Sequence, residues 1–324
     1  MDRTTSPDPI VPPPPSSPEG EVHIPGGAAG PGSAGKSMAC GAGRRPTPIL
    51  AVATDLDGTL LGPTGTVSKR TVEAVRQARR AGIAVIPATA RPAAAMISAC
   101  GPAPVGPLAV CSNGSVLVDV ESGQVIHHHQ LTAEVVTTIM STLREALPGI
   151  RFAIETLDQF HYEEGMIDRE AALRWGILTP PARDIGSRLD GAVTKLCCWH
   201  PRMRAAETAT AVARVAGALA EVTSAGADWA LAGAPGITKA VGLSNACRRL
   251  SIPADQVVAV GDELNDLPML AWAAWPVAVA NARDKVLEVA SEVVPANVDD
   301  GVAQLLEQLS LDGDRIVAPP VAPE

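Results

Sequence analysis

Four short apolar runs of the same form limit the possible fold more than any other feature of this sequence. Each run is continuously apolar and ends abruptly in polar residues or glycine; the four are Ile49–Thr54, Ile83–Thr89, Leu108–Asn113 and Val257–Asp262. Continuous rather than alternating apolar residues are typical of strands that are buried on both faces of a parallel sheet. The runs therefore predict the core strands of an α/β protein.

Helical patterns separate these runs. Between the first two, apolar residues recur at helical spacing from Val67 to Ala78, and Gly82 then ends the pattern. A second helix is expected over Thr238–Leu250, directly before the fourth run. Such alternation predicts a Rossmann-like, doubly wound parallel sheet, in which ligands bind at the carboxyl ends of the strands. We therefore expect the polar ends of all four runs to meet at one edge.

The pattern changes between the third run and the second helix. We expect a hairpin that turns at Ser122–Gly123, then helices over Thr132–Leu147 and Met203–Leu219, strands over 151–156 and 192–199, and a final strand pair. This segment is interpreted as an inserted α+β cap domain. The sequence thus predicts an α/β core from residues 48–115 and 234–311, and a cap from residues 116–233.

The two ends of the chain differ in composition from the rest. Residues 1–47 contain 10 Pro and 8 Gly, and they cannot bury enough apolar surface to offset their ordering entropy. We predict disordered tails over residues 1–47 and 312–324. The segment GPGSAGKS, Gly30–Ser37, matches the phosphate-binding pattern G-x-x-x-x-G-K-[ST]. Because neither a strand before it nor a helix after it is indicated, we interpret the match as coincidental.

Charge and composition restrict the partners. The formal net charge of −9 argues against a nucleic acid or an anionic membrane surface, and an anionic substrate would need a local positive site. The six cysteines lack C-x-x-C spacing, which favours a reduced, cytoplasmic setting. The longest apolar run, Met269–Ala280, is too short to span a bilayer, and the N-terminal residues have no apolar stretch typical of a signal peptide. The sequence gives no indication of the oligomeric state.

Two carboxylates follow the first run. Asp55 and Asp57 stand two residues apart just beyond the strand end, where both can face one site, and Gly58 allows a sharp turn. Two such carboxylates repel each other by about 4 kcal/mol at ~4 Å and an effective dielectric near 20. A divalent cation would compensate, and hard oxygen ligands without a Cys/His cluster favour Mg²⁺ over Zn²⁺. The alternative is an acidic turn that merely ends a strand.

A second acidic cluster, GDELND, follows the fourth run over residues 261–266. It places further carboxylates, including Asp262 and Asp266, at the same expected edge of the sheet. Asp262 or Asn265 could instead be an ordinary helix cap. Two acidic clusters that both stand at strand ends are harder to explain as caps, so together they favour a metal site.

Groups suited to an anion come from the remaining segments. Thr89 and Arg91 stand at the end of the second run. Lys239 begins the second predicted helix, where its charge and the helix N-terminal amides both favour an anion. Each of these residues alone could equally be an ordinary strand-end or surface residue.

In this order, the motifs resemble those of a known family. DLDGTLL, then a strand-end Thr, then a Lys before a helix, then GDELNDLPML, are similar to the four motifs of the haloacid dehalogenase superfamily of phosphohydrolases. The insertion between the Thr and the Lys, together with CSNGSVL and NVDDGVAQLLEQL, resembles the Cof-type branch of that superfamily. The resemblance covers roughly residues 49–310.

The resemblance implies a role for each matching residue. Asp55 would attack phosphorus and become an aspartyl-phosphate, and Asp57 would protonate the leaving alcohol and then deprotonate the hydrolytic water. Mg²⁺ would be held by Asp55, the backbone carbonyl of Asp57, and Asp262. Phosphate or substrate would be bound by Thr89, Arg91, Lys239 and Asn265, with Asp266 orienting the metal site and Lys239.

The chain departs from the usual family pattern at two positions. Ala90 and Ala240 stand where the family usually has glycine, and the extra methyl groups matter only if these backbones need a positive φ. In the predicted cap, residues 160–163, FHYE, precede Gly165 and are candidate substrate contacts.

By resemblance, the chain is expected to be a Mg²⁺-dependent phosphatase of small phosphorylated metabolites, such as sugar phosphates, with a cap that excludes bulk water. One alternative is a phosphomutase of the same superfamily, whose cap usually lies between the first two motifs. Only 31 residues separate Asp57 from Thr89, which disfavours it. The other is a non-catalytic phosphometabolite sensor, against which the intact Asp55 and Asp57 argue.

Overall fold

The computed structural model describes residues 45, 48–168, 172, 177, 179–189, 191–225 and 229–313. The predicted tails and the GPGSAGKS segment lie outside these residues, apart from Arg45 and residues 312–313. The latter two belong to the last helix, so the C-terminal tail was predicted to begin slightly too early.

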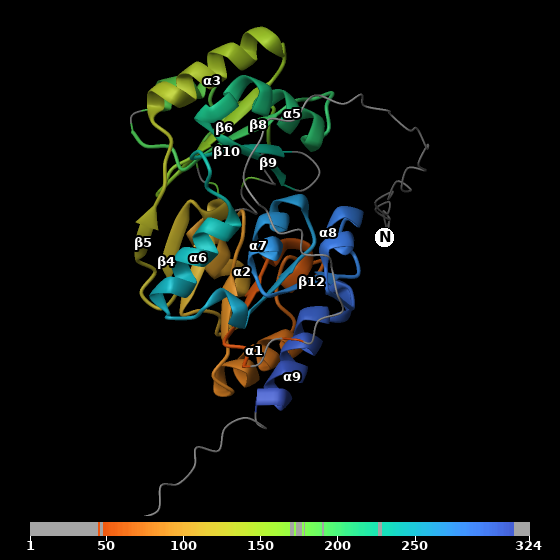
Figure 1. Ribbon diagram of the computed structural model, residues 1–324. Helices are drawn as coiled ribbons and strands as arrows, with labels where there is room; N and C mark the ends of the chain where they lie inside the picture. Colours follow the sequence, from red (N-terminus) through yellow and green to blue (C-terminus); the bar gives the residue numbers. More distant parts are fainter. Residues whose placement is uncertain are drawn as a thin grey trace, which may run out of the picture. The chain divides into compact units, whose positions relative to one another are not determined.

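A five-stranded parallel sheet forms the centre of the core, in the order β13-β12-β11-β1-β2 (Figure 1). Its strands are β1 (Ala51–Thr54), β2 (Ala84–Pro87), β11 (Val257–Gly261), β12 (Trp275–Val279) and β13 (Glu292–Val294). The predicted Rossmann-like parallel sheet is confirmed. The last two strands were not predicted, because β13 has three residues and β12 begins with a Trp-Pro pair that obscures its apolar pattern.

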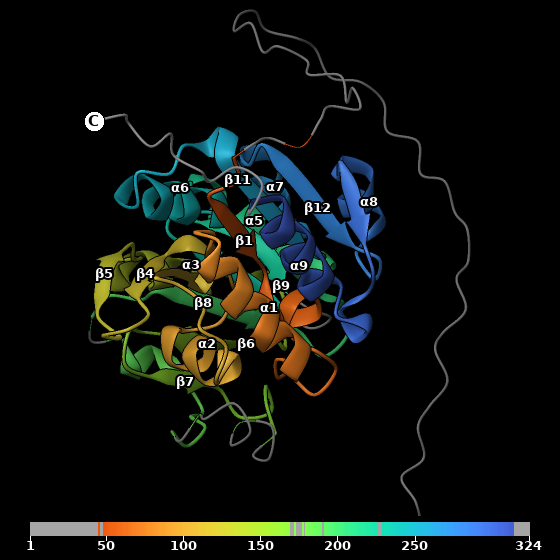
Figure 2. The same cartoon turned by 90° about the horizontal axis from the view of Figure 1, so that it is seen from below.

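Helices cover both faces of this sheet (Figure 2). One face carries α1 (Lys69–Arg80) and α9 (Gly301–Gly313); the other carries α6 (Lys239–Arg249), α7 (Leu267–Trp272) and α8 (Asp284–Val289); α2 (Ala93–Cys100) follows β2. The hydroxyl of Ser68 caps α1 by accepting from the Thr71 amide, and Val72 and Val75 are buried against the sheet. Both core helices expected from the sequence are therefore present.

The third apolar run behaves differently from the other three. It forms β3 (Leu108–Cys111), which lies beside the end of β2, where a parallel bridge joins Val110 to Ala88. Its main partner is antiparallel: β3 pairs with β4 (Val116–Asp119), which pairs with β5 (Val125–His128). Val116, Leu117 and Val118 are buried in the core cluster. The hairpin therefore belongs to the core, and the predicted cap boundary at residue 116 is corrected.

The cap contains its own antiparallel sheet, in the order β7-β6-β8-β10-β9. Its elements are α3 (Ala133–Ala146), α5 (Ala205–Ala216), β6 (Arg151–Glu155), β7 (Phe160–Tyr162), β8 (Lys195–Trp199), β9 (Glu221–Ala225) and β10 (Trp229–Gly233). The sheet lies beneath α3 and α5 (Figure 1). Alternate strand residues such as Phe152, Ile154 and Leu196 are buried in one apolar cluster with residues of both helices. Because side chains alternate along a strand, the residues between them lie on the opposite face. The predicted α+β cap is confirmed as part of the fold.

Candidate active site

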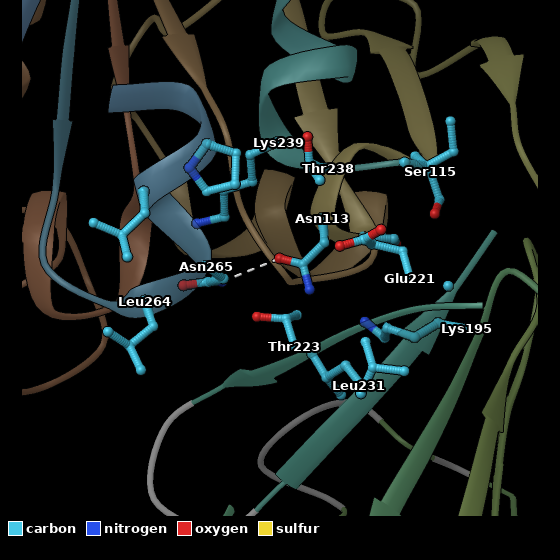
Figure 3. Close-up of a pocket in the computed structure, with 16 residues that line it drawn as sticks. Asn113, Ser115, Lys195, Glu221, Thr223, Leu231, Thr238, Lys239, Leu264 and Asn265 are labelled. Carbon is cyan, nitrogen blue, oxygen red and sulfur yellow. Dashed lines mark hydrogen bonds between the residues drawn. The ribbon is translucent and has the colours of Figure 1, made fainter. Parts of the chain in front are cut away.

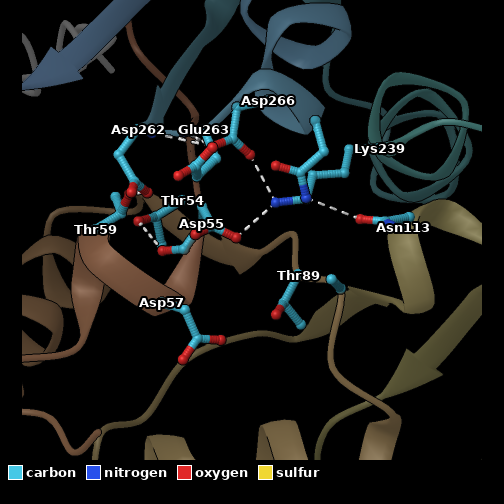
Figure 4. A network of polar contacts seen from close by, with 12 residues as sticks. Thr54, Asp55, Asp57, Thr59, Thr89, Asn113, Lys239, Asp262, Glu263 and Asp266 are labelled. Atoms are coloured by element: carbon cyan, nitrogen blue, oxygen red, sulfur yellow. Dashed lines mark hydrogen bonds and ion pairs between the residues drawn. The ribbon is translucent and has the colours of Figure 1, made fainter. Parts of the chain in front are cut away.

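Two neighbouring strands bring the two acidic motifs together. β1 and β11 are adjacent and parallel, and the Asp55 amide donates to the Val260 carbonyl (2.9 Å), which extends the pairing just past the end of β1. Asp55 and Asp262 therefore stand at the same edge of the sheet, although they are far apart in the sequence (Figure 4).

Three buried carboxylates form a compact cluster at this edge. One oxygen from each of Asp55, Asp262 and Asp266 lies within 4.8 Å of the others. Burial raises the pKa of Asp55 above its ordinary value, and it raises the pKa of Asp262 to about 7. Thr59 Oγ1 donates to Asp262 Oδ1 (2.5 Å), which orients this carboxylate. Crowded hard-oxygen donors suit a divalent cation such as Mg²⁺, so the residues present fit the metal that the sequence predicts.

Lys239 lies between two of these carboxylates. Its Nζ is 2.5 Å from Asp55 Oδ1 and 2.6 Å from Asp266 Oδ1, and the residue is 1% exposed. Burial alone would lower the pKa of Lys239, but the carboxylates of Asp266 and Asp55 raise it above its ordinary value. Asp266 Oδ2 in turn accepts from the amides of Asp262 (2.9 Å) and Glu263 (3.0 Å). Asp266 is thus placed between Lys239 and the backbone that carries Asp262.

The side chain of Asp57 lies outside the acidic cluster. Its carboxylate accepts from Arg91 Nε (2.7 Å) and Nη2 (2.5 Å) and is about half exposed. This hydrogen bonding is the main cause that raises the pKa of Arg91. The turn directly after Asp57 depends on Gly58, which has φ +82° and on which a Cβ would lie 2.4 Å from Asp262 Oδ2. Asp57 and Arg91 therefore contact each other directly. The chemical roles expected of them stay predictions.

Thr89 and Asn265 are linked through a residue that the sequence interpretation did not select. The backbone carbonyl of Thr89 accepts from the Asn113 amide (2.9 Å), and Asn265 Nδ2 donates to Asn113 Oδ1 (3.1 Å). Thr89 is fully buried and lies near Asp55 and Asp57 in Figure 4. Asn113 therefore joins the second and fourth motifs from the end of β3.

The turn that carries Asn113 has an unusual backbone. Ser112 and Asn113 have φ of +51° and +57°, and Gly114 follows at +102°. A Cβ on Gly114 would lie 2.1 Å from the Thr238 carbonyl, so only glycine allows α6 to start this close. Positive φ at consecutive non-glycine residues is often found at functional sites. The letters SNG at a strand end were the signal available in the sequence.

The two departures from the family pattern leave the backbone unstrained. Within the part of the chain that the structure describes, Ala90 and Ala240 are not among the residues with positive φ. Their methyl groups therefore carry no conformational cost of the kind that would demand glycine.

A buried ion pair from the cap reaches the core beside this turn. Lys195 Nζ lies 2.7 Å from Glu155 Oε2 and donates to the Ala90 carbonyl (2.7 Å), while Ser112 Oγ donates to Glu155 Oε1. The carboxylate of Glu155 raises the pKa of Lys195 against the opposing effect of burial. The pair thus contacts Ala90, which precedes Arg91, and Ser112, which precedes Asn113.

A cavity of about 300 Å³ separates the cap from these groups (Figure 3). It is lined from the core by residues including Asn113, Lys239 and Asn265, and from the cap by Lys195, Glu221, Thr223 and Leu231. The cap residues were not identified from the sequence. The predicted contacts at 160–163 do not line this cavity: Phe160 packs near Trp229 (6.0 Å between ring centroids), and Glu163 pairs with Arg144.

A comparison of the sequence with family models identifies the family. The model described as haloacid dehalogenase-like hydrolase matches residues 52–306. The chain belongs to the haloacid dehalogenase-like hydrolases. Hydrolases of this family generally use a divalent metal ion, and the cluster of Asp55, Asp262 and Asp266 supplies suitable ligands.

Several curated relatives of this haloacid dehalogenase-like hydrolase are named phosphatases. The chain is 27% identical over 265 residues to 5-amino-6-(5-phospho-D-ribitylamino)uracil phosphatase YitU of Bacillus subtilis, with 79% of this chain and 96% of the relative covered. It is 28% identical to phosphatase YwpJ of the same organism (80% and 99% covered) and 28% identical to a phosphoglycolate phosphatase of Methanopyrus kandleri (80% and 96% covered). The predicted superfamily and the class of phosphoric monoester hydrolase are confirmed.

Solved structures share the fold. The phosphatase BT1666 of Bacteroides thetaiotaomicron is 25% identical, with a TM-score of 0.69 and 81% of this chain and 96% of the other covered. A haloacid dehalogenase-like hydrolase from B. subtilis gives a TM-score of 0.71 at 24% identity, with 81% and 100% covered, and supports the fold alone. In the described part of this hydrolase, no helix has both the length and the apolar character needed to cross a membrane.

Proposed function

We propose that this chain is a Mg²⁺-dependent phosphatase that hydrolyses phosphomonoesters of small metabolites, such as sugar phosphates, through an aspartyl-phosphate on Asp55. The observation that carries the proposal is the cluster of buried Asp55, Asp262 and Asp266 carboxylates with Lys239 at the carboxyl ends of β1 and β11. The Asp55 carboxylate lies beside a buried ammonium and beside carboxylates that can bind a metal ion. This arrangement suits attack on phosphorus, because the negative charge of the phosphoryl group must be balanced there.

In the first step, an Asp55 oxygen forms a bond to phosphorus while the bond from phosphorus to the leaving oxygen breaks. Asp57 gives its proton to that leaving oxygen. In the second step, Asp57 takes a proton from water, the water oxygen bonds to phosphorus, and the bond to Asp55 breaks to release phosphate. The half-exposed Asp57 carboxylate, outside the acidic cluster, supports this acid–base role.

Positive groups and fixed donors would hold the phosphoryl oxygens. Lys239 is charged and next to Asp55, while Thr89 stands at the adjacent strand end. Asp55, the Asp57 carbonyl and Asp262 would hold Mg²⁺, which when bound supplies charge neutralisation for the phosphoryl group. Asp266 would keep Lys239 and the Asp262 backbone in place through the contacts described above.

The size of the cavity supports a small substrate. A space of about 300 Å³ under the cap accommodates a small metabolite and excludes a folded protein chain. The names of two of these relatives point the same way, because they specify phosphorylated small molecules, a ribitylaminouracil phosphate and phosphoglycolate.

The test is phosphate release from p-nitrophenyl phosphate and from an alkyl phosphate, with and without Mg²⁺. We expect Asp55→Asn to abolish release from both, because no nucleophile remains. Asp57→Asn should lower kcat/KM, which reports formation of the aspartyl-phosphate, by about 10²–10⁴ for the alkyl ester and by less for p-nitrophenyl phosphate, because nitrophenolate departs without protonation. Asp158→Asn, at an exposed position between β6 and β7, is the matched control and should retain activity.

Three outcomes would contradict the proposal. Binding of phosphorylated metabolites without any release in the presence of Mg²⁺ would indicate a sensor. Transfer of the phosphoryl group to another hydroxyl without net release of phosphate would indicate a mutase. Full activity of Asp55→Asn would show that another group is the nucleophile. Mass spectrometry of the acid-quenched enzyme should find the phosphoryl group on the peptide that contains Asp55.

A further inference from the structure

The cavity under the cap begins at the phosphate site and extends between two differently built walls (Figure 3). Lys239 is part of its lining, so the leaving group of an ester whose phosphate is held there would extend into the cavity. The core wall presents neutral polar residues such as Asn113 and Asn265, and the cap wall presents Lys195, Glu221 and Thr223.

Both ammonium groups that line the cavity already have negatively charged partners. Lys239 contacts Asp55 and Asp266 at 2.5 and 2.6 Å. Lys195 contacts Glu155 at 2.7 Å and donates to the Ala90 carbonyl. Neither cation is left to balance a second negative charge on a substrate.

Glu221 is in the opposite situation. It is half-buried at the start of β9, opposite Gly233, which has no side chain to cover it. Among the described residues, its carboxylate has no hydrogen-bond or ion-pair partner, and Glu221 lines the cavity together with Asn113 (Figure 3). Among the described residues that line the cavity, Glu221 is therefore the charge without a partner, and Thr223 and Asn113 are neutral polar residues of the same lining.

We propose that Glu221 makes this cavity a subsite for an uncharged leaving group that carries hydroxyl groups, and that it excludes esters whose leaving group carries a carboxylate. A substrate hydroxyl can donate to the Glu221 carboxylate, whereas a substrate carboxylate would be repelled in a partly desolvated site. This inference rests on the proposed phosphatase activity and selects one class among its substrates.

A matched pair of substrates tests the inference. D-Ribitol 5-phosphate and 5-phospho-D-ribonate differ only in a CH₂OH group or a carboxylate at the end remote from the phosphate. With the full chain and Mg²⁺, we expect kcat/KM to favour the polyol ester by about tenfold or more. Glu221→Gln keeps the shape and removes the charge, so the ratio of the two kcat/KM values should fall toward one.

The control is Glu145→Gln, on the exposed side of α3, which removes the same charge from the same domain and should keep the wild-type ratio. Equal use of the two esters by the wild type, or an unchanged ratio in Glu221→Gln, would overturn the inference. If p-nitrophenyl phosphate is hydrolysed in that case, only the subsite assignment is wrong. If it is not hydrolysed at all with Mg²⁺, the proposed phosphatase activity fails, and this inference fails with it.

Discussion

Buried charges at the acidic cluster are costly for the fold. The cluster holds three carboxylates and one ammonium, Lys239, which contacts two of them, Asp55 and Asp266. The burial that raises the pKa of Asp55 also opposes folding with these groups charged. Groups arranged at such cost are typical of functional sites. Gly58 allows the arrangement, because its positive φ turns the chain and its missing side chain leaves room for Asp262.

Replacement of Gly58 separates these two contributions. Gly58→Ala should cost about 1–2 kcal/mol of stability through its positive φ and should also weaken Mg²⁺ binding, because the new Cβ would displace Asp262. Gly82→Ala is the matched control, since Gly82 has φ +83° with no atom within 4 Å of the added Cβ. Urea unfolding and the Mg²⁺ dependence of phosphate release measure both effects. Equal Mg²⁺ dependence in the two variants would contradict the explanation.

Strands β6 and β8 of the cap carry different residues on their two faces. Phe152, Ile154 and Leu196 pack under the helices, whereas Glu155 and Lys195 reach the core at Ser112 and Ala90. Alternation along each strand produces this division. The contact between cap and core thus includes a buried ion pair next to the Ser112–Asn113 turn.

Removal of one partner of this pair should be more harmful than removal of both. Lys195→Met should cost about 3–5 kcal/mol, because it leaves the Glu155 carboxylate buried without its cation. The double variant Lys195→Met/Glu155→Leu should be more stable than Lys195→Met. A double-mutant cycle by urea unfolding measures the coupling. Arg70→Met, in the exposed Arg70–Glu307 pair, is the control and should cost much less; additive single effects at 155 and 195 would contradict the prediction.

The cap insertion separates the core into two segments of the sequence, and both segments contribute strands to one sheet. β1 and β2 precede the cap, β11 to β13 follow it, and β1 pairs with β11. The metal-type ligands Asp55 and Asp262 lie on opposite sides of this division. A cation that binds both carboxylates would therefore stabilise the association of the two segments.

Metal binding should be visible in the stability of the whole chain. Mg²⁺ at about 100 times its Kd should raise the free energy of unfolding by about 2.7 kcal/mol, because it binds the folded state. Asp262→Asn should abolish this increment, and EDTA should abolish it for the wild type. Asp158→Asn should retain it. Urea unfolding at fixed ionic strength makes the measurement, and an equal Mg²⁺ effect in Asp262→Asn would show that the ion binds elsewhere.

Much of the core and its motifs could be predicted from local patterns. Continuous apolar runs indicate buried parallel strands, and such strands place their carboxyl ends at one edge, so Asp55, Thr89 and Asp262 could be assigned to one edge before any coordinates. Lys239 followed from its place at a helix start. The predictions succeeded where a rule depends on residues close together in the chain.

Contacts across the fold decided the rest. The hairpin of β4 and β5 belongs to the core because β4 pairs with β3. The sequence of the hairpin alone does not indicate whether it pairs with a core strand or with a cap strand. The contact between Asp57 and Arg91 depends on the adjacent positions of the ends of β1 and β2 in the sheet. Glu221 and Lys195 face the site because of the register of the cap sheet and the side it turns to the core. Local sequence does not encode these choices, because their energies arise only when distant segments pack together.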